Sequence, residues 1–122
     1  MAKIVVTCQG QTLDDKVDPR FGRAANFLVV DLDTLKFEVL DNSATNSMGQ
    51  GAGIQSAQTV ANTGAEAVLT GFVGPKAFQA LSAANIKVGQ GLEGVTVRDA
   101  IARYKAGKVE FATGPSRQGH WR

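Results

Sequence analysis

Cysteine and histidine are almost absent from this chain, which has 122 residues and one of each, Cys8 and His120. A single cysteine excludes an internal disulfide and a Cys-x-x-Cys metal site. The single histidine lies in the tail, so the sequence has no Ser-His-Asp set and no zinc-type ligand cluster. We therefore expect His120 to be solvated and non-functional, and we predict that the protein is not an enzyme.

Dense charge of one sign and long apolar runs are also missing. The formal net charge is only +2, whereas binding to a phosphate backbone usually needs a dense basic face. No apolar stretch approaches the roughly 20 residues that span a bilayer. The apolar run in the N-terminal segment MAKIVVTCQG is too short for a signal peptide. We expect a soluble, cytoplasmic protein that binds neither nucleic acid nor membrane.

Glycine, in contrast, is abundant and organises the middle of the chain. The segment Gly49 to Pro75 reads as a glycine loop, a helix, a short strand and a second glycine loop that opens another helix. Apolar residues recur at helical spacing from Ile54, and Gly64 stands where that helix should end. The second loop, Gly71 to Gly74, precedes Pro75, which suits the first turn of a helix. Each loop therefore leads into a helix N-terminus, whose free N–H groups and partial positive charge can receive an anion.

Apolar runs and turn signals predict the element order β-β-β-α-β-α-β-α. The predicted strands are Lys3–Cys8, Phe27–Leu32, Lys36–Leu40, Ala67–Leu69 and Ile86–Val88, and the predicted helices follow Gly53, span Lys76–Ala84, and run from the Thr96 cap to Gly107. The short link between the second and third strands makes an antiparallel hairpin, and the later alternation builds parallel pairs. We predict a single α/β domain over residues 1–112, with a five-stranded mixed sheet in the order 3-2-1-4-5 and three helices on both faces. Residues 113–122 are predicted to be a flexible tail.

In this strand order the chain changes direction between the first and fourth strands, whose carboxyl ends flank a crevice. Ligands of open α/β sheets tend to bind at such a switch point. We expect Cys8, the Asn-, Ser- and Gly-rich loop of residues 42–53 and the Gly71–Gly74 loop to converge there. A loop as long as 42–53 in a compact domain is usually functional or mobile.

The glycines before the first helix do not match a nucleotide-binding motif. Gly49, Gly51 and Gly53 are spaced as G-x-G-x-G, and Ile54 holds the place of the third glycine in a dinucleotide fingerprint. No Gly-Lys-Ser/Thr follows, so a phosphate loop is excluded as well. Two interpretations remain open, a glycine-lined anion pocket and a mobile linker.

Two arginines and the cysteine are the other candidates. Arg20 and Arg23 flank Phe21 and Gly22 and could clamp a polyanion. Alternatively, one of them pairs with a nearby acid, Asp14, Asp15 or Asp18. Cys8 is either a soft metal ligand or a small core residue.

Two blocks of sequence resemble a known family. DPRFGRAANF, followed by GAGIQSAQTVANTGAEAVLTGFVGPKAFQALSAANIKVGQG, resembles the accessory family of nitrogenase iron–molybdenum cofactor biosynthesis. The resemblance extends from Lys3 to about Phe111 and implies a ribonuclease H-like α/β fold. The family includes small cofactor carriers, the carboxyl-terminal domain of the cofactor-assembly enzyme, and carriers of a molybdenum–copper sulfide cluster, which the chain resembles most.

The resemblance implies a non-enzymatic carrier or scaffold that binds an anionic molybdenum–copper sulfide cluster non-covalently. The predicted cofactor-binding residues are Arg20, Phe21, Gly22, Arg23, Gly49, Gln50, Gly51, Ala52, Gly53, Gly71, Phe72, Gly74 and Pro75. Several relatives carry a histidine or cysteine in these loops, whereas the long loop here has Met48 and no histidine. Bridging sulfides held electrostatically are then the simpler arrangement, with Cys8 as the remaining candidate metal ligand.

Several alternatives stay open at this point. The cofactor could be an iron–molybdenum cofactor precursor, or there could be none, and a cluster donor or recipient protein is a possible partner. The chain could instead be an interaction module that docks to a partner without metal. A phosphoryl-transfer enzyme of the same fold rests on fold analogy alone. It would use acids such as Asp18 or Asp31, but the first strand lacks the central carboxylate of a two-metal centre.

Overall fold

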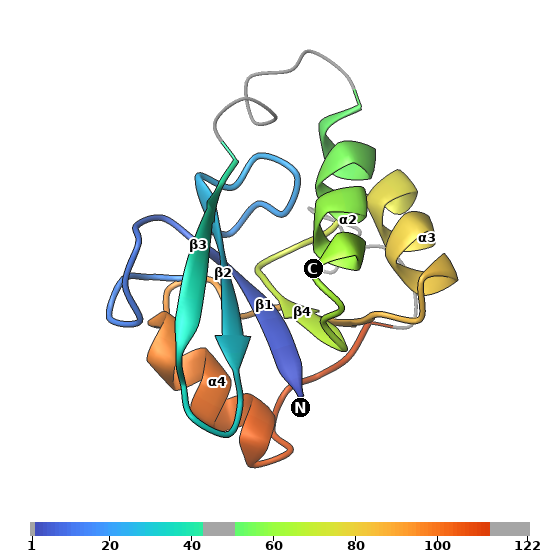
Figure 1. The fold of residues 1–122 in the computed structure, drawn as a ribbon. Helices are drawn as coiled ribbons and strands as arrows, with labels where there is room; N and C mark the ends of the chain where they lie inside the picture. The colour runs from blue at the N-terminus through green and yellow to red at the C-terminus, as the bar shows by residue number, and fades with distance from the viewer. Residues whose placement is uncertain (1, 43–50, 113–122) are drawn as a thin grey trace.

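The computed structural model describes residues 2–42 and 51–112, and these ranges form a mixed sheet covered by helices on both faces (Figure 1). The five strands run in the order β3-β2-β1-β4-β5. The elements are β1 Lys3–Cys8, β2 Asn26–Asp31, β3 Phe37–Asp41, α2 Ala52–Asn62, β4 Ala67–Leu69, α3 Pro75–Ala83, β5 Lys87–Gly89 and α4 Val97–Lys105. The predicted fold class and strand order are therefore confirmed. The predictions for Gly49, Gln50, Met48, His120 and the tail concern residues outside the described ranges.

Three strands are shifted by one residue from the prediction: β2 begins and ends one residue earlier, and β3 and β5 begin and end one residue later. The starts of β3 and β5 have local reasons. β3 begins at Phe37 rather than Lys36 because the Lys36 carbonyl accepts the Asp31 N–H at 2.8 Å within the hairpin turn. β5 begins at Lys87 rather than Ile86 because the Ile86 N–H bonds to the Leu81 carbonyl at 3.0 Å and closes the end of α3.

β1 is the central strand and has different neighbours on its two sides. It pairs antiparallel with β2 and parallel with β4. Its side chains alternate between two buried cores: Ile4, Val6 and Cys8 face α4, and Val5 faces α2 and α3. Such full burial on both faces is expected of a central strand in an α/β sheet. The carboxyl ends of β1 and β4 consequently lie at one end of the sheet, where α2 and α3 begin (Figure 1).

Helix ends follow the local signals in the sequence. Gly64, with φ of 78°, follows the Thr63 C-cap of α2 in the left-handed conformation that glycine adopts without steric cost. Thr96 caps α4, because its side chain accepts the Asp99 N–H at 3.1 Å.

Candidate anion-binding site

The crevice between β1 and β4 is filled by the chain itself. The Asp18 N–H donates to the Thr7 carbonyl at 3.0 Å, and the Thr7 hydroxyl donates to the Asp18 carbonyl at 2.8 Å. The Thr7 and Thr70 hydroxyls lie 2.9 Å apart, and all three residues are buried. A ligand bound at the carboxyl ends of β1 and β4 would therefore lie outside this hydrogen-bonded layer.

Residues 18–25, here called the arginine loop, run from this layer toward the helices. The Pro19 carbonyl accepts the Phe72 N–H at 2.9 Å, and Arg20 forms an isolated parallel bridge with Phe72. Gly71 lies against the same backbone, because a Cβ there would be 2.6 Å from the Pro19 Cα. The arginine loop and the Gly71–Gly74 loop therefore lie side by side, and this approach requires glycine.

The arginine loop also lies directly on the first turn of α2. A Cβ at Gly22 would be 2.9 Å from both N and Cα of Gly53. The Gly22 carbonyl accepts hydrogen bonds from Ser56 Oγ at 3.2 Å and Asn42 Nδ2 at 3.3 Å. Gly53 in turn faces Ala77 of α3, since a Cβ on Gly53 would be 3.2 Å from the Ala77 Cβ. The structure thus brings together the three predicted segments that it describes.

The N-termini of α2 and α3 differ from that of α4 in how their first N–H groups are satisfied. In the described part of the chain, no side chain caps either helix, and neither first turn contains an acid. The N–H groups of Ala52, Gly53 and Ile54 have no acceptor within residues 2–42 and 51–112, and the same holds for Lys76 and Ala77. Unpaired N–H groups at a helix N-terminus carry a partial positive charge. Two such groups of donors therefore start next to each other.

The third helix has no such free end. In α4, the Val97 N–H donates to the Asp15 carbonyl and the Arg98 N–H to the Leu13 carbonyl, at 2.9 and 2.8 Å. The Thr96 cap accepts the Asp99 N–H, and the Asp99 carboxylate lies in the first turn. The N–H groups in the first turn of α4 thus have acceptors within the chain, and in this respect α4 differs from the two helices at the candidate site.

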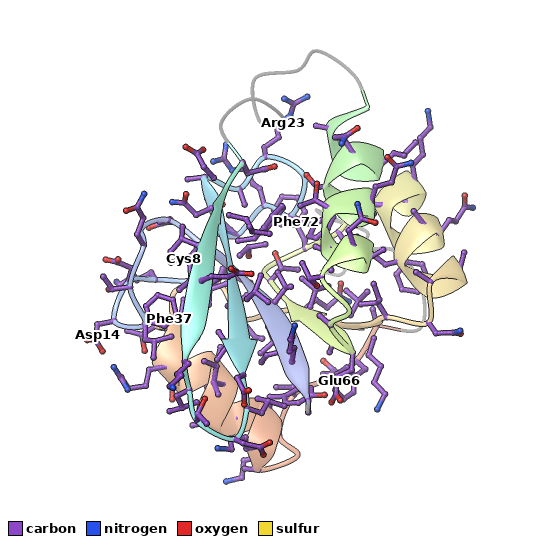
Figure 2. The ribbon with its side chains drawn as sticks, in the orientation of Figure 1. Cys8, Asp14, Arg23, Phe37, Glu66 and Phe72 are labelled. Atoms are coloured by element: carbon purple, nitrogen blue, oxygen red, sulfur yellow. The ribbon has the colours of Figure 1, made fainter. Side chains whose placement is uncertain are left out.

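Both arginines of the loop are exposed beside these helix ends. Arg20 Nε lies 3.4 Å from Asp18 Oδ1, so the predicted pairing with a nearby acid occurs, yet its side chain remains 54% exposed. Arg23 lies at the same end of the molecule as the start of α2 (Figure 2). Lys76, which the sequence analysis missed, is exposed in the first turn of α3. The signal that could have found it is a lysine directly after Gly74 and Pro75.

The two aromatic residues of the predicted site differ in their surroundings. Phe21 is 2% exposed and stacks on Phe27 with ring centroids 5.7 Å apart, so it anchors the loop in the core. Phe72 is half-buried beside α2 (Figure 2). Gly74 and Pro75 are exposed where α3 begins.

Cys8 does not join these residues. It is fully buried with the residues that face α4, and its thiol donates to the Thr12 carbonyl at 3.8 Å. Figure 2 shows it well separated from Phe72. Burial is the largest cause that raises the pKa of the Cys8 thiol above its ordinary value, with smaller contributions from Asp15 and Asp18. The thiolate needed for metal binding is therefore disfavoured, and we correct the expectation that Cys8 converges on the site.

The acids do not gather into a metal centre. In the strand register, Asp31 of β2 lies opposite Lys3 at the start of β1, whereas Asp18 is hydrogen-bonded to Thr7 near the end of β1. Lys3 and Thr7 are roughly 13 Å apart at the usual strand rise. Within residues 2–42 and 51–112, no group of three His, Cys, Asp or Glu side chains could hold a metal ion.

A surface depression lies near the start of β1, lined by Lys3, Val29, Asp31, Lys36, Phe37 and Glu38. It is at the end of the strand opposite the candidate site. Within the described ranges, no helix has the length and apolar character needed to cross a membrane.

Comparisons with known proteins agree with this fold. A family model described as dinitrogenase iron-molybdenum cofactor matches residues 2–107. The apo form of the orange protein from Desulfovibrio gigas is 56% identical, over 96% of this chain and 98% of that chain, with a TM-score of 0.92. A putative NifB protein from Thermotoga, described as a member of the DUF35 family, is 33% identical, over 98% and 100% of the two chains, with a TM-score of 0.81. An uncharacterized protein of Methanocaldococcus jannaschii is 29% identical over 100 residues, which are 80% of this chain and 83% of that protein.

Proposed function

The chain belongs to the dinitrogenase iron-molybdenum cofactor family, and we propose that it is a non-enzymatic carrier that holds an anionic metal–sulfur cluster without covalent bonds. The likeness to the orange protein supports a cofactor-related role. One observation carries the proposal: the N-termini of α2 and α3, which have no side-chain cap among the described residues and no acid in their first turns, begin next to each other and beside the arginine loop.

The charge at this end of the sheet suits a polyanion. Each helix N-terminus is equivalent to about +0.5 of an elementary charge, and the arginine loop adds the guanidinium groups of Arg20 and Arg23. Asp18 offsets part of the Arg20 charge at 3.4 Å, whereas the charge of the two helix ends remains available to an anionic guest. Backbone N–H groups and guanidinium groups are donors, and the sulfides on the surface of a cluster are acceptors.

The surroundings also suit a soft, weakly hydrated anion held by its sulfides. Ile54 is 39% exposed in the first turn of α2, and Phe72 and Pro75 add apolar surface near the start of α3. Cys8 faces the other core, so no cysteine of the described chain points to this surface. The cargo we propose is the molybdenum–copper sulfide cluster. An iron–molybdenum cofactor precursor would be held by the same donors.

The phosphoryl-transfer alternative is disfavoured by the placement of its acids. Asp18 and Asp31 lie at opposite ends of β1 and cannot share a metal ion. Asp18 is moreover occupied by hydrogen bonds within the arginine loop.

The proposal is tested by reconstitution. Apoprotein is mixed with tetrathiomolybdate and copper(I) without oxygen, and we expect a charge-transfer spectrum, distinct from that of the inorganic mixture, that co-elutes with the protein on gel filtration. Each exposed arginine contributes on the order of 1 kcal/mol, so Arg20→Gln with Arg23→Gln should weaken binding roughly 30-fold. A spectrum that stays with the small molecules would contradict the proposal.

The matched control is the pair Arg98→Gln and Arg103→Gln, which removes the same charge from α4. These arginines pair with Asp14 and Asp99 at 3.0 and 3.1 Å and are exposed away from the site. We expect an affinity within about twofold of the wild type, because exposed charges beyond a Debye length are screened. An equal loss of affinity in both double variants would mean that only net charge matters.

Elemental analysis of protein isolated without oxygen identifies the metal. A colourless protein that captures its partner without metal would favour an interaction module.

A further inference from the structure

Asp18 is a carboxylate of the arginine loop, and it is buried rather than facing solvent. The residue is 2% exposed. Its Oδ1 accepts the Arg20 N–H at 3.1 Å and lies 3.4 Å from Arg20 Nε, and its Oδ2 accepts the Ala25 N–H at 3.2 Å. A buried carboxylate with this many donors is a strong local constraint, because hydrogen bonds to charged groups are stronger than neutral ones.

These hydrogen bonds tie the two ends of the arginine loop to one side chain. Arg20 and Ala25 are held by opposite oxygens of the same carboxylate, so the residues between them must form a closed turn. The main chain of Asp18 is itself fixed by two hydrogen bonds to Thr7 of β1. The loop is thereby fastened to the central strand of the sheet.

The far side of the same loop meets α2. Gly22 lies in backbone contact with Gly53, and its carbonyl accepts from Ser56 and Asn42. The loop is therefore held between Asp18 on its inner side and α2 on its outer side. A loop that opened on the inner side would change both the contact with α2 and the direction of the arginines.

We propose that Asp18 is the positioning residue of this site: its buried carboxylate closes the arginine loop and so fixes Arg20 and Arg23 beside the N-terminus of α2. This inference rests on the proposed function. It makes a prediction opposite in sign to simple electrostatics. Removing a negative charge near an anion should tighten binding, whereas loss of the positioning contacts should weaken it.

Asp18→Asn separates the two effects. The amide keeps the shape of the side chain but replaces one acceptor oxygen by an NH2 group, so one of the two loop N–H groups faces a donor. We expect tetrathiomolybdate with copper(I) to bind roughly 10-fold more weakly, as for the loss of one hydrogen bond to a charged group. The matched control is Asp14→Asn, whose carboxylate is 76% exposed and pairs with Arg98. It should bind within about twofold of the wild type.

Coupling to Arg20 distinguishes positioning from general loosening. In an Arg20→Gln background the loss caused by Asp18→Asn should be smaller than in the wild type, because part of its effect acts through Arg20. The proposal would be overturned if the losses of binding free energy in Asp18→Asn and Arg20→Gln simply added in the double variant. Unchanged or tighter binding in Asp18→Asn alone would overturn it as well.

A third measurement needs no variant and no cluster. Amide hydrogen exchange in the wild type should show protection of the Arg20 and Ala25 N–H groups, although Arg20 is exposed and Ala25 only half-buried. Exchange at the rate of an unstructured peptide would refute the closed loop. If the wild type binds no thiomolybdate, the proposed function fails, while the exchange result still decides whether Asp18 closes the loop.

Discussion

The contact between Gly22 and Gly53 can be tested with a single methyl group. Gly22→Ala would place a Cβ 2.9 Å from N and Cα of Gly53 and 3.3 Å from the carbonyl carbon of Ala52, all of them backbone atoms. Ordinary contacts of a Cβ begin near 3.4 Å, so the arginine loop must retreat by about 0.5 Å. Gly22 does not have a positive φ, so the conformation itself allows alanine and the test isolates the steric effect.

The retreat also lengthens the hydrogen bonds to the Gly22 carbonyl. Those from Ser56 and Asn42 are already 3.2 and 3.3 Å long. Overpacking of a rigid contact costs about 1–3 kcal/mol. With a urea m-value of about 2 kcal/mol per molar, we expect the unfolding midpoint to fall by roughly 1 M. Cluster affinity should fall as well, because the arginines move with the loop.

Gly74→Ala is the matched control for this prediction. Gly74 lies in the neighbouring loop with φ of −75°, and a Cβ there meets nothing within 4 Å. Its free energy of unfolding should stay within about 0.5 kcal/mol of the wild type. If urea denaturation gives the same midpoint for Gly22→Ala and Gly74→Ala, the loop does not press on α2 and the reasoning about the site is refuted.

Three further predictions concern residues outside the site. Burial, reinforced by the hydrogen bond to Glu66, raises the pKa of Tyr104 to about 12. The resulting contribution to stability is present below the ordinary tyrosine pKa of 10 and is lost as the pH rises through the folded value. Glu66→Gln should lower the pH midpoint at which this single tyrosine becomes a phenolate, measured by its ultraviolet absorbance. An unchanged midpoint would show that Glu66 has no part in it. Thr96→Ala removes the cap that accepts the Asp99 N–H and should cost about 1 kcal/mol in urea denaturation, whereas Thr34→Ala in the β2–β3 turn should cost less. Hydrogen bonds from Thr12 lower the pKa of Asp15, so Asp15→Asn should destabilise the protein above pH 3.8. This loss of stability should vanish as the pH falls through the lowered pKa of Asp15. A difference in stability between variant and wild type that persists in acid would point to packing instead.

Much of the fold could be predicted because its signals are local. Gly64 and Thr96 mark helix ends by conformation and hydrogen bonding within a few residues, and the strand order follows from connection lengths. The face that Cys8 occupies could not be predicted in this way. Both faces of β1 are buried, so alternation alone does not say which face is covered by α2 and α3.

The site was predictable in its parts but not in its assembly. The sequence indicates glycine loops and helix N-termini, and the structure places the described ones together. The contact of Gly22 with Gly53 joins residues far apart in the chain, and no local pattern encodes it. The sequence indicates Asp18 only as an ion-pair partner or metal ligand, because no spacing rule connects it to Ala25, whose N–H its carboxylate accepts.

The alignment of α2 and α3 has a consequence for how cargo arrives. Both helices begin at the carboxyl ends of parallel strands, and neither has a basic residue in its last turn, so no side chain there offsets either dipole. A polyanion approaching from solution meets a directional long-range field and is turned toward the correct end of the molecule before contact. That steering extends about 10 Å at 0.1 M salt and about 3 Å at 1 M. Capture should therefore slow sharply as ionic strength rises, while release, governed by short-range donors, changes much less.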